Sequence, residues 1–341
     1  MDPTSATLAS RQRPVNSKPI GYFKKMAPGP NSPLPSLPTT AVVGTGALGM
    51  YYGAKLAKSG VPVAFLARRD LSHLQKQGLQ VRCPYGDFLL SPVRACGQPE
   101  EIGPVDLVLI CIKTTANADL KRLIPPLLGP GTVVCTLQNG LGNEELLAST
   151  VGKERVLGGV CHVCVSRPEP GVARNMACTD IKFSDLSGGD TPRARSLAKI
   201  FTDAGVDCTV APSIGSARWY KLVWNVPFNG LGIAGGPGGR DTQQVLEDPA
   251  LHQEAKALMT EVLAASAKLG YPQDPNLIEK EIARTRTMGH YKSSSQFDWE
   301  AGKPVELESI WGEALRQGTA VGVPMPHLQK LYEKLRGLVK V

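Results

Sequence analysis

The stretch that decides the fold is TTAVVGTGALGMYYGAKLAKSG, residues 39–60. It begins with a short apolar run, TTAVVG, that is typical of a buried strand. It ends in MYYGAKLAKSG, whose spacing of apolar residues predicts a helix. Between the two lies a G-x-G-x-x-G turn made of Gly44, Thr45, Gly46, Ala47, Leu48 and Gly49. A glycine turn that follows a strand and opens a helix is the context in which this motif binds a dinucleotide.

Each glycine of the turn has its own task. Gly44 permits the tight turn out of the strand, Gly46 lets the backbone approach a pyrophosphate, and Gly49 allows the helix to pack closely on the strand. The pyrophosphate then lies against free amides at the positive end of the helix dipole. The motif alone leaves open a glycine turn in a cofactor-free sheet.

Outward from this turn, strand patterns alternate with helix patterns. Three further apolar runs predict strands, at residues 61–68, 106–113 and 132–140. One segment, residues 114–128, predicts a helix behind them. Such alternation implies right-handed crossovers and a mostly parallel sheet. The expected fold is therefore α/β, with an N-terminal Rossmann dinucleotide-binding domain over residues 40–211.

After residue 211 the alternation stops, and four segments show helical spacing, residues 216–235, 249–270, 305–322 and 326–341. A chain of 341 residues is long enough for two hydrophobic cores. We expect residues 212–341 to form an all-helical domain that carries substrate and catalytic residues.

Residues 1–39 differ from the rest, with eight prolines and no acidic residue after Asp2. This composition predicts a disordered extension. A basic, serine-containing leader is also similar to an organelle transit peptide, but its prolines disfavour the amphipathic helix of such peptides. A cytoplasmic protein is the preferred interpretation, and a misplaced start codon explains the segment equally well.

The charge and hydropathy exclude two classes of partner. The net charge is +8, yet no basic run with interleaved aromatic residues suggests nucleic-acid binding. No run of about eighteen apolar residues predicts a membrane span. Excess positive charge instead suits a phosphorylated cofactor or a carboxylate substrate.

The end of the second predicted strand indicates which cofactor binds. Enzymes that use NAD usually carry Asp or Glu there for the ribose 2′-hydroxyl, but this chain has Ala67-Arg68-Arg69. A guanidinium group binds a 2′-phosphate well, so we expect NADP(H), held by Arg68. Asp70 follows and is interpreted as a cap of the next helix.

Two polar residues end neighbouring strands. Lys113 closes DLVLICIK, and Asn139-Gly140 closes TVVCTLQNG. Ligands of doubly wound sheets bind at the carboxyl ends of the strands, so both residues are expected at the site. An Asn-Gly pair is also an ordinary turn.

In WYKLVWNVPFNG, Lys221, Asn225 and Asn229 have spacings of four residues and form one polar line along a mostly apolar helix. A partly buried lysine can have its pKa lowered and serve as an acid or base. The alternative is a lysine that reaches water at the edge of the helix.

With these motifs in this order, the chain resembles the ketopantoate reductase (2-dehydropantoate 2-reductase) family over nearly all of residues 40–341. The resemblance rests on GTGALG, CIKT, LQNGLGNEE, WYKLVWNVPFN, SSSQFDWEAGKPVELESIWG and GVPMPHL. It implies NADPH-dependent reduction of 2-dehydropantoate to (R)-pantoate, a step toward pantothenate and coenzyme A.

The resemblance also implies a role for each matched residue. Lys221 matches the general acid, and Glu306 the acid that binds the substrate hydroxyl beside the cofactor. Ser294 matches the residue that holds the substrate carboxylate, and Asn225 and Asn229 match substrate contacts. The remaining matches are the residues lining the cofactor and the reacting end, Lys113 and Asn139, and the 2′-phosphate ligand, Arg68.

The chain departs from the family beside Ser294. Tyr291-Lys292 replaces an asparagine common in bacterial members, and Ser295 replaces a methionine. Two alternatives therefore stay open, a reductase of another branched or aromatic 2-keto acid and a non-catalytic NADP(H) sensor. A homodimer is the candidate assembly.

Eight cysteines include one C-x-x-C, formed by Cys161 and Cys164 within GGVCHVCVS. The surrounding residues predict a strand, whereas the redox motif normally opens a helix, and no second C-x-x-C completes a zinc site. We expect neither a metal site nor a redox role here.

Overall fold

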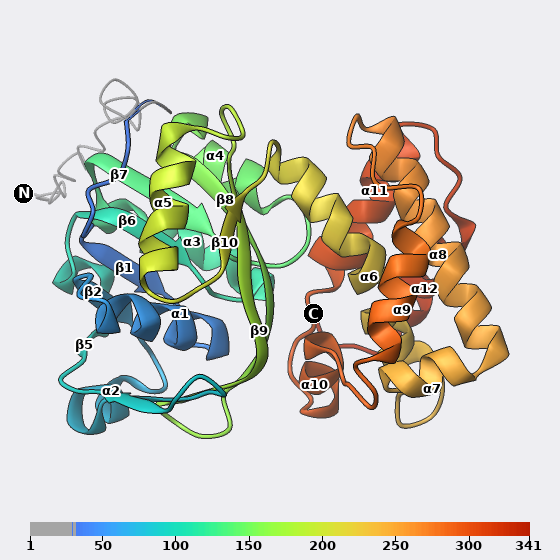
Figure 1. The fold of residues 1–341 in the computed structure, drawn as a ribbon, viewed down its shortest axis with the longest axis horizontal. Helices are drawn as coiled ribbons and strands as arrows, with labels where there is room; N and C mark the ends of the chain where they lie inside the picture. The colour runs from blue at the N-terminus through green and yellow to red at the C-terminus, as the bar shows by residue number, and fades with distance from the viewer. Residues whose placement is uncertain (1–28, 30–31) are drawn as a thin grey trace, which may run out of the picture.

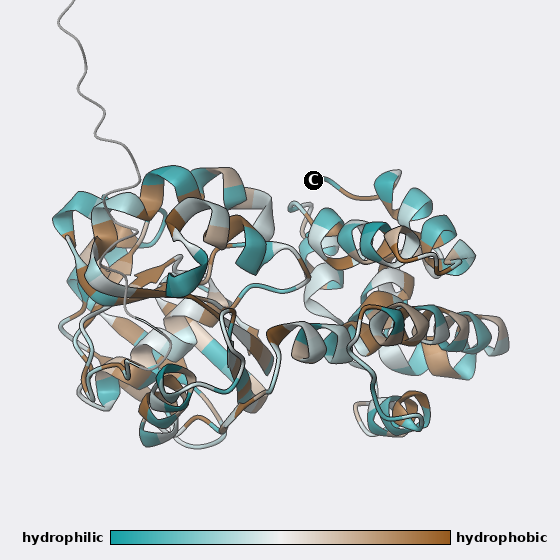
Figure 2. Ribbon diagram, turned by 90° about the horizontal axis from the view of Figure 1, so that it is seen from above, coloured by the Kyte–Doolittle hydropathy of each residue, from teal (hydrophilic) through white to brown (hydrophobic). Residues whose placement is uncertain are grey.

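The computed structural model describes residues 29 and 32–341 of the chain. Figure 1 shows two bodies, a sheet flanked by helices and a bundle of helices that follows it. Figure 2, seen from above, shows them side by side, with hydrophobic segments both in the strands of the sheet and in the helices of the second body. The structure confirms the predicted fold class, an α/β domain followed by a helical one.

The first body is one sheet with the strand order β4-β3-β9-β8-β7-β6-β1-β2-β5, and β10 pairs with β9. The strands are β1 (Thr40–Val43), β2 (Val63–Leu66), β3 (Leu79–Arg82), β4 (Phe88–Leu90), β5 (Arg94–Cys96), β6 (Val105–Ile110), β7 (Leu128–Thr136), β8 (Val156–Ser166), β9 (Val172–Asp185) and β10 (Cys208–Val210).

The strands from β5 to β8 are parallel, as predicted, and β1 lies between β2 and β6. The chain therefore leaves β1 for one side of the sheet and later returns to the other side. This reversal creates the switch point at which ligands bind in doubly wound folds. Two antiparallel pairs that were not predicted, β8–β9 and β3–β4, extend the sheet beyond β8.

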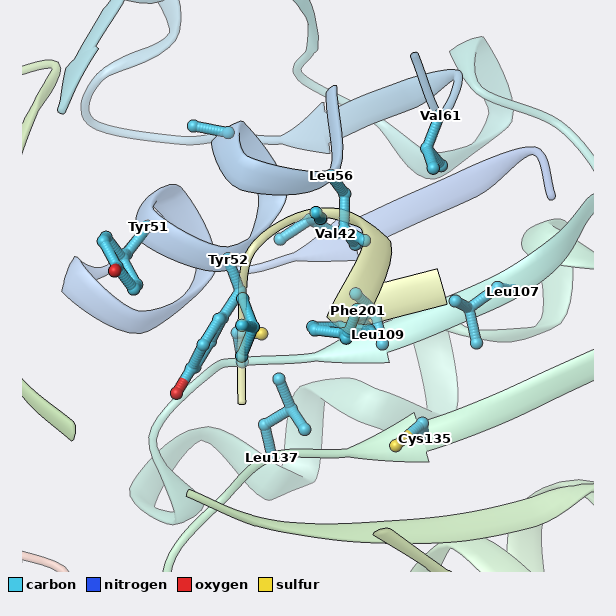
Figure 3. Packing of buried hydrophobic residues seen from close by; sticks show 14 of the residues in the cluster. Val42, Tyr51, Tyr52, Leu56, Val61, Leu107, Leu109, Cys135, Leu137 and Phe201 are labelled. Carbon is cyan, nitrogen blue, oxygen red and sulfur yellow. The ribbon is translucent and has the colours of Figure 1, made fainter. Parts of the chain in front are cut away.

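Alternate residues of the central strands pack on opposite faces of the sheet. Val42 and Leu109 belong to a core beneath α1 (Ala47–Lys58) and α5 (Pro192–Asp203). Figure 3 shows this packing, in which the rings of Tyr52 and Phe201 lie 6.0 Å apart. The opposite face packs on α3 (Leu120–Leu123) and α4 (Asn143–Val151). A short helix, α2 (Leu71–Gln77), follows β2.

The single helix predicted over residues 114–128 is wrong. The segment forms the 3₁₀ helix η3 (Thr114–Asp119), α3 and the 3₁₀ turn η4 (Pro125–Leu127). Pro125 and Pro126 lack the amide hydrogen that a continuing helix needs. Ala116 also has non-helical dihedral angles.

The second body consists of helices from α6 onward. These are α6 (Ile214–Ala234), α7 (Thr242–Glu247), α8 (Pro249–Lys268), α9 (Leu277–Arg286), α10 (Ser294–Glu300), the π-helical turn η6 (Glu308–Gly312), α11 (Glu313–Ala320) and α12 (Pro326–Arg336). Their apolar faces form a separate core around Trp219 and Trp311. Because the N-terminal part of α6 also contacts β8, this helix joins the two bodies.

The end of the predicted extension is part of the fold. Leu34 is buried in the sheet core, and its amide donates to Ser196 Oγ at 2.9 Å. The prediction of disorder is therefore wrong at this residue, because its side chain is buried in the core and its amide is hydrogen-bonded to α5. The part of the prediction that covers residues 1–28, 30 and 31 lies outside the described residues. Among the helices of the described part, none is long and apolar enough to cross a membrane.

Candidate active site

The glycine turn has the close contacts that the motif predicts. Gly44 has a φ of 108°, and a Cβ there would lie 2.8 Å from the amide nitrogen of Ile112. A Cβ on Gly49 would lie 2.0 Å from the carbonyl oxygen of Gly44. Any larger residue at either position would push α1 away from β1 and β6.

Gly46 differs, because a Cβ there would meet no atom within 4 Å. It precedes α1, which has no side-chain cap and no acidic residue in its first turn. The first amides of a helix lack partners within the helix, and the helix dipole gives this end positive potential. Open space before an uncapped helix N-terminus fits the pyrophosphate of a dinucleotide.

Arg68 follows β2 at the same edge of the sheet. Its side chain is 80% exposed, and its nearest ion-pair partner, Asp119, is 3.9 Å away. The guanidinium group is therefore available to an external anion. Asp70 does not cap α2, contrary to the sequence interpretation. Its buried carboxylate instead accepts hydrogen bonds from Arg167 at 2.6 Å.

Lys221 connects α6 to the loop after β7 and to the middle of β8. Its Nζ donates to Asn139 Oδ1, in the loop after β7, and to the carbonyl oxygen of Cys161 on β8, both at 2.6 Å. An ammonium group has three N–H donors, so one remains for a ligand. The predicted alternative, a lysine that reaches into water, is wrong.

The charge on Lys221 is easily lost. Burial lowers its pKa to about 8, because removal from water disfavours the ammonium form. The nearby Arg218 acts in the same direction, whereas the Glu306 carboxylate opposes the shift. A lysine of this pKa can release and regain a proton near neutral pH.

Glu306 precedes η6 and connects the helical body to the end of β6. Its Oε1 accepts the amide hydrogen of Thr114 at 2.9 Å, and its Oε2 lies 3.9 Å from Lys113 Nζ. Lys113 also donates to Asp298 of α10. Burial disfavours the Lys113 ammonium, but Glu306 and Asp298 outweigh this effect and raise its pKa. The structure thus brings the predicted Lys113 and Glu306 together.

The predicted polar line on α6 is buried. Asn225 and Asn229 are 5% and 3% exposed. Neither carboxamide has a side-chain hydrogen-bond partner within the described part of the chain. Buried amides normally find partners, so these two can serve a ligand beside Lys221.

Ser294 is exposed at the start of α10, and the neighbouring Ser293 accepts the capping hydrogen bond from Gln296. Ser294 shares a face of α10 with Asp298, four residues on, which pairs with Lys113. The described residues thus give Ser294 a position near this ion pair but no contact with Lys221.

Sequence reasoning missed the residues that fix the loop after β7. The buried Arg218 donates to Glu144 Oε1 at 3.1 and 2.5 Å and also to the carbonyl oxygen of Gln138. Asn143 Nδ2 donates to the carbonyl oxygen of Asn139 at 2.9 Å. Arg218 lies one helical turn before Lys221, and this spacing was the only sign in the sequence that Arg218 belongs to the same site.

The fold and the site define the class of two-domain, dinucleotide-binding oxidoreductases. The family profile "Ketopantoate reductase PanE/ApbA" matches residues 40–188, and "Ketopantoate reductase PanE/ApbA C terminal" matches residues 213–339. The chain therefore belongs to the ketopantoate reductase family, and the resemblance found in the sequence is confirmed.

Individual relatives agree with this assignment. A 2-dehydropantoate 2-reductase from a Nostoc species is 33% identical over 87% of this chain and 94% of its own. The crystal structure of 2-dehydropantoate 2-reductase from Geobacter metallireducens has a TM-score of 0.84 at 40% identity, covering 87% of this chain and 99% of its own. The crystal structure of 2-dehydropantoate 2-reductase from Methylococcus capsulatus has a TM-score of 0.81 at 34% identity, covering 88% of this chain and 96% of its own.

Proposed function

We propose that this protein reduces 2-dehydropantoate to (R)-pantoate with NADPH. The observation that carries the proposal is the Lys221 ammonium group, held by Asn139 and Cys161 with one N–H free and a pKa of about 8. A non-catalytic NADP(H) sensor needs no such proton donor. The relatives named 2-dehydropantoate 2-reductase support the choice of substrate.

The residues of the first body fit the cofactor. The turn from Gly44 to Gly49 would hold the pyrophosphate, and Arg68 would bind the 2′-phosphate. When bound, NADPH supplies the hydride that adds to the ketone carbon of the substrate.

The chain's own residues supply the proton and the orientation. Negative charge grows on the carbonyl oxygen during reduction, and Lys221 donates its free N–H proton to that oxygen. Glu306 accepts a hydrogen bond from the substrate hydroxyl. Its other contacts, to Thr114 and Lys113, keep its carboxylate in place beside the end of β6.

The asparagines and Ser294 orient the substrate. The free carboxamides of Asn225 and Asn229 bind its polar groups, and Ser294 binds its carboxylate. Fixing a carboxylate and a ketone at once converts binding energy into orientation of the reacting carbon.

The test is NADPH oxidation, followed by absorbance, after addition of 2-dehydropantoate. We expect turnover, with a higher kcat/KM than for a panel of other branched and aromatic 2-keto acids. A protein that binds NADPH but oxidises it with no member of the panel would contradict catalysis. A clear preference for another keto acid would leave the proposed mechanism in place but show that 2-dehydropantoate is not the substrate.

We also propose a cytoplasmic homodimer. The dimeric ketopantoate reductase from Staphylococcus aureus shares the fold, with a TM-score of 0.73 at 18% identity. Light scattering of the purified full-length chain tests the assembly, and a monomeric mass at assay concentrations contradicts it. Fluorescent fusions to the complete chain test the compartment.

A further inference from the structure

The two cysteines of the C-x-x-C motif point in different directions. Cys161 is buried in the core beneath α1, where its thiol interacts with the Tyr52 hydroxyl. Cys164 follows three residues later on β8, and such residues project from opposite faces of a strand. The Cys164 thiol is half-buried and donates to Tyr291 Oη at 3.7 Å.

A different cysteine, Cys178 of β9, lies beside Cys164 on the neighbouring strand. The β8–β9 register pairs Val163 with Thr179 and Cys164 with Ala177, which leaves Cys178 as an additional residue. In a β-bulge two residues of one strand oppose one residue of the other. Cys178 therefore lies between the residue that opposes Cys164 and the residue that opposes Val163, which places it beside Cys164 across the strand pair, and, in addition to burial, the nearby Cys164 contributes to a raised pKa of the Cys178 thiol.

The bulge is strained and firmly held. Cys178 has a φ of 54°, the only positive value among the described non-glycine residues, and its side chain is exposed. Asn175 Nδ2 donates to the carbonyl oxygens of Cys178, Ala177 and Cys164, at 2.9, 3.2 and 3.5 Å. Strained backbone persists only where its surroundings enforce it, so the neighbouring position of the two cysteines is a fixed feature of the fold.

We propose that Cys164 and Cys178 form a reversible disulfide, a modification site whose oxidant is a small-molecule disulfide such as oxidised glutathione. The exposed Cys178 thiolate attacks one sulfur of the oxidant, breaks its S–S bond and releases one thiol. Cys164 then attacks the Cys178 sulfur and releases the second thiol. Two protein thiols are oxidised, one small disulfide is reduced, and both protons end on the released thiols.

Oxidation reaches the substrate residues through Tyr291. A disulfide sulfur carries no hydrogen, so Cys164 can no longer donate to the Tyr291 hydroxyl. Tyr291 lies three residues before Ser294, and its ring is 6.3 Å from that of Trp224, the neighbour of Asn225. This consequence rests on the proposed function: oxidation raises the KM for the keto acid several-fold and leaves the Kd of NADPH unchanged.

The test is peptide mapping of the full-length protein after incubation with oxidised glutathione. Partial removal of the sulfur from water, together with the neighbouring Cys164 and Asp180, raises the pKa of the otherwise exposed Cys178 thiol, so the incubation is run at alkaline pH, where more thiolate is present. We expect a Cys164–Cys178 linked peptide that disappears after treatment with dithiothreitol. A Cys161–Cys164 link, a lasting glutathione adduct on Cys178 or unmodified thiols would each overturn the proposal.

Two variants make the test specific. Cys178→Gly removes the thiol, suits the positive φ and abolishes the link. Cys208→Ser replaces a half-buried cysteine of β10 and leaves the link intact. A link without a change in KM refutes the consequence for the substrate. Because mapping needs no turnover, failure of the proposed ketopantoate activity is distinguished from failure of the disulfide.

Discussion

At the scale of single residues, the properties of Lys221 depend on its surroundings. Two of its three donors are used by Asn139 and Cys161, which fixes the direction of the third. Burial and the charges of Arg218 and Glu306 then set how readily that proton leaves. The same lysine on an exposed helix would have neither a fixed direction for its free N–H bond nor a lowered pKa.

Replacing this residue tests the role directly. Lys221→Ala should lower kcat by about two to four orders of magnitude, the usual effect of removing a general acid. The Kd of NADPH, measured by fluorescence titration, should change little, because the turn at Gly44–Gly49 is elsewhere. As a matched control, Lys199→Ala removes an exposed lysine of α5 and should leave kcat unaltered. A Lys221→Ala protein with normal kcat would exclude the role.

The pH dependence follows from the pKa of about 8. Reduction needs the protonated lysine, so kcat should be high below this pH and fall as the pH rises through it. Glu306→Gln removes a carboxylate that raises the pKa of Lys221, so the fall should move to lower pH. Stopped-flow rates across the pH range measure both curves. An unchanged midpoint in the variant would contradict the electrostatic coupling.

We expect cofactor preference to depend on Arg68, whose exposed guanidinium has one distant partner. Arg68→Glu should reverse the preference from NADPH to NADH, because a carboxylate repels a 2′-phosphate and accepts a hydrogen bond from a 2′-hydroxyl. The ratio of kcat/KM for the two cofactors measures this. Equal use of both by the unmodified protein would refute the assignment, and Arg69→Glu serves as the control.

At the scale of elements, the buried Arg218–Glu144 pair connects α6 to α4. It also holds the loop that carries Asn139, since Arg218 donates to the Gln138 carbonyl. The position of Lys221, the proposed proton donor, relative to the sheet therefore depends on an ion pair between two helices that are far apart in the sequence.

Breaking this pair should affect both stability and catalysis. Glu144→Gln leaves a buried arginine without its counter-charge and should lower the free energy of unfolding by about 3–5 kcal/mol. Less compensated positive charge near Lys221 should also move the fall in kcat to lower pH. Denaturant unfolding and pH profiles measure the two effects. The exposed pair Lys199–Asp203 gives the control, because Asp203→Asn should cost at most about 1 kcal/mol.

At the scale of the whole molecule, several contacts join the two cores. α6 crosses between the bodies, Glu306 accepts from Thr114, and Lys113 pairs with Asp298. The proposed site lies where these connections meet. Each body supplies part of it, because the sheet presents the cofactor residues and the helices present Lys221 and Glu306.

The buried position of Leu34 predicts which N-terminal residues the fold needs. Deleting residues 1–31 should preserve stability and turnover, since these residues are rich in proline and their apolar residues do not recur at helix or strand spacing. Deleting residues 1–36 also removes Leu34 from the core and should lower the melting temperature. Leu34→Ala should likewise lower the melting temperature, with a decrease in the free energy of unfolding of about 2 kcal/mol. Equal melting temperatures for the two truncations would show that Leu34 contributes nothing.

The sequence by itself determined the fold class and the core of the element order, namely the strands β1, β2, β6 and β7 followed by a helical region, because each of these signals is local. The glycine turn, the apolar runs of β1, β6 and β7, and the helical spacing after residue 211 are all visible within about ten residues. The same holds for the proposed proton donor, since Lys221, Asn225 and Asn229 repeat on one helix.

Only the tertiary structure decided which distant side chains meet. Nothing local pairs Arg218 with Glu144 or Asp298 with Lys113, or places Cys178 beside Cys164, because these arrangements depend on strand register and on the packing of one body against the other. Local signals also misled where tertiary contacts outweighed them, as at Asp70, which pairs with Arg167 rather than capping a helix. Short-range patterns fix the elements, whereas the surroundings of a buried charge are set by residues that the chain brings together only when folded.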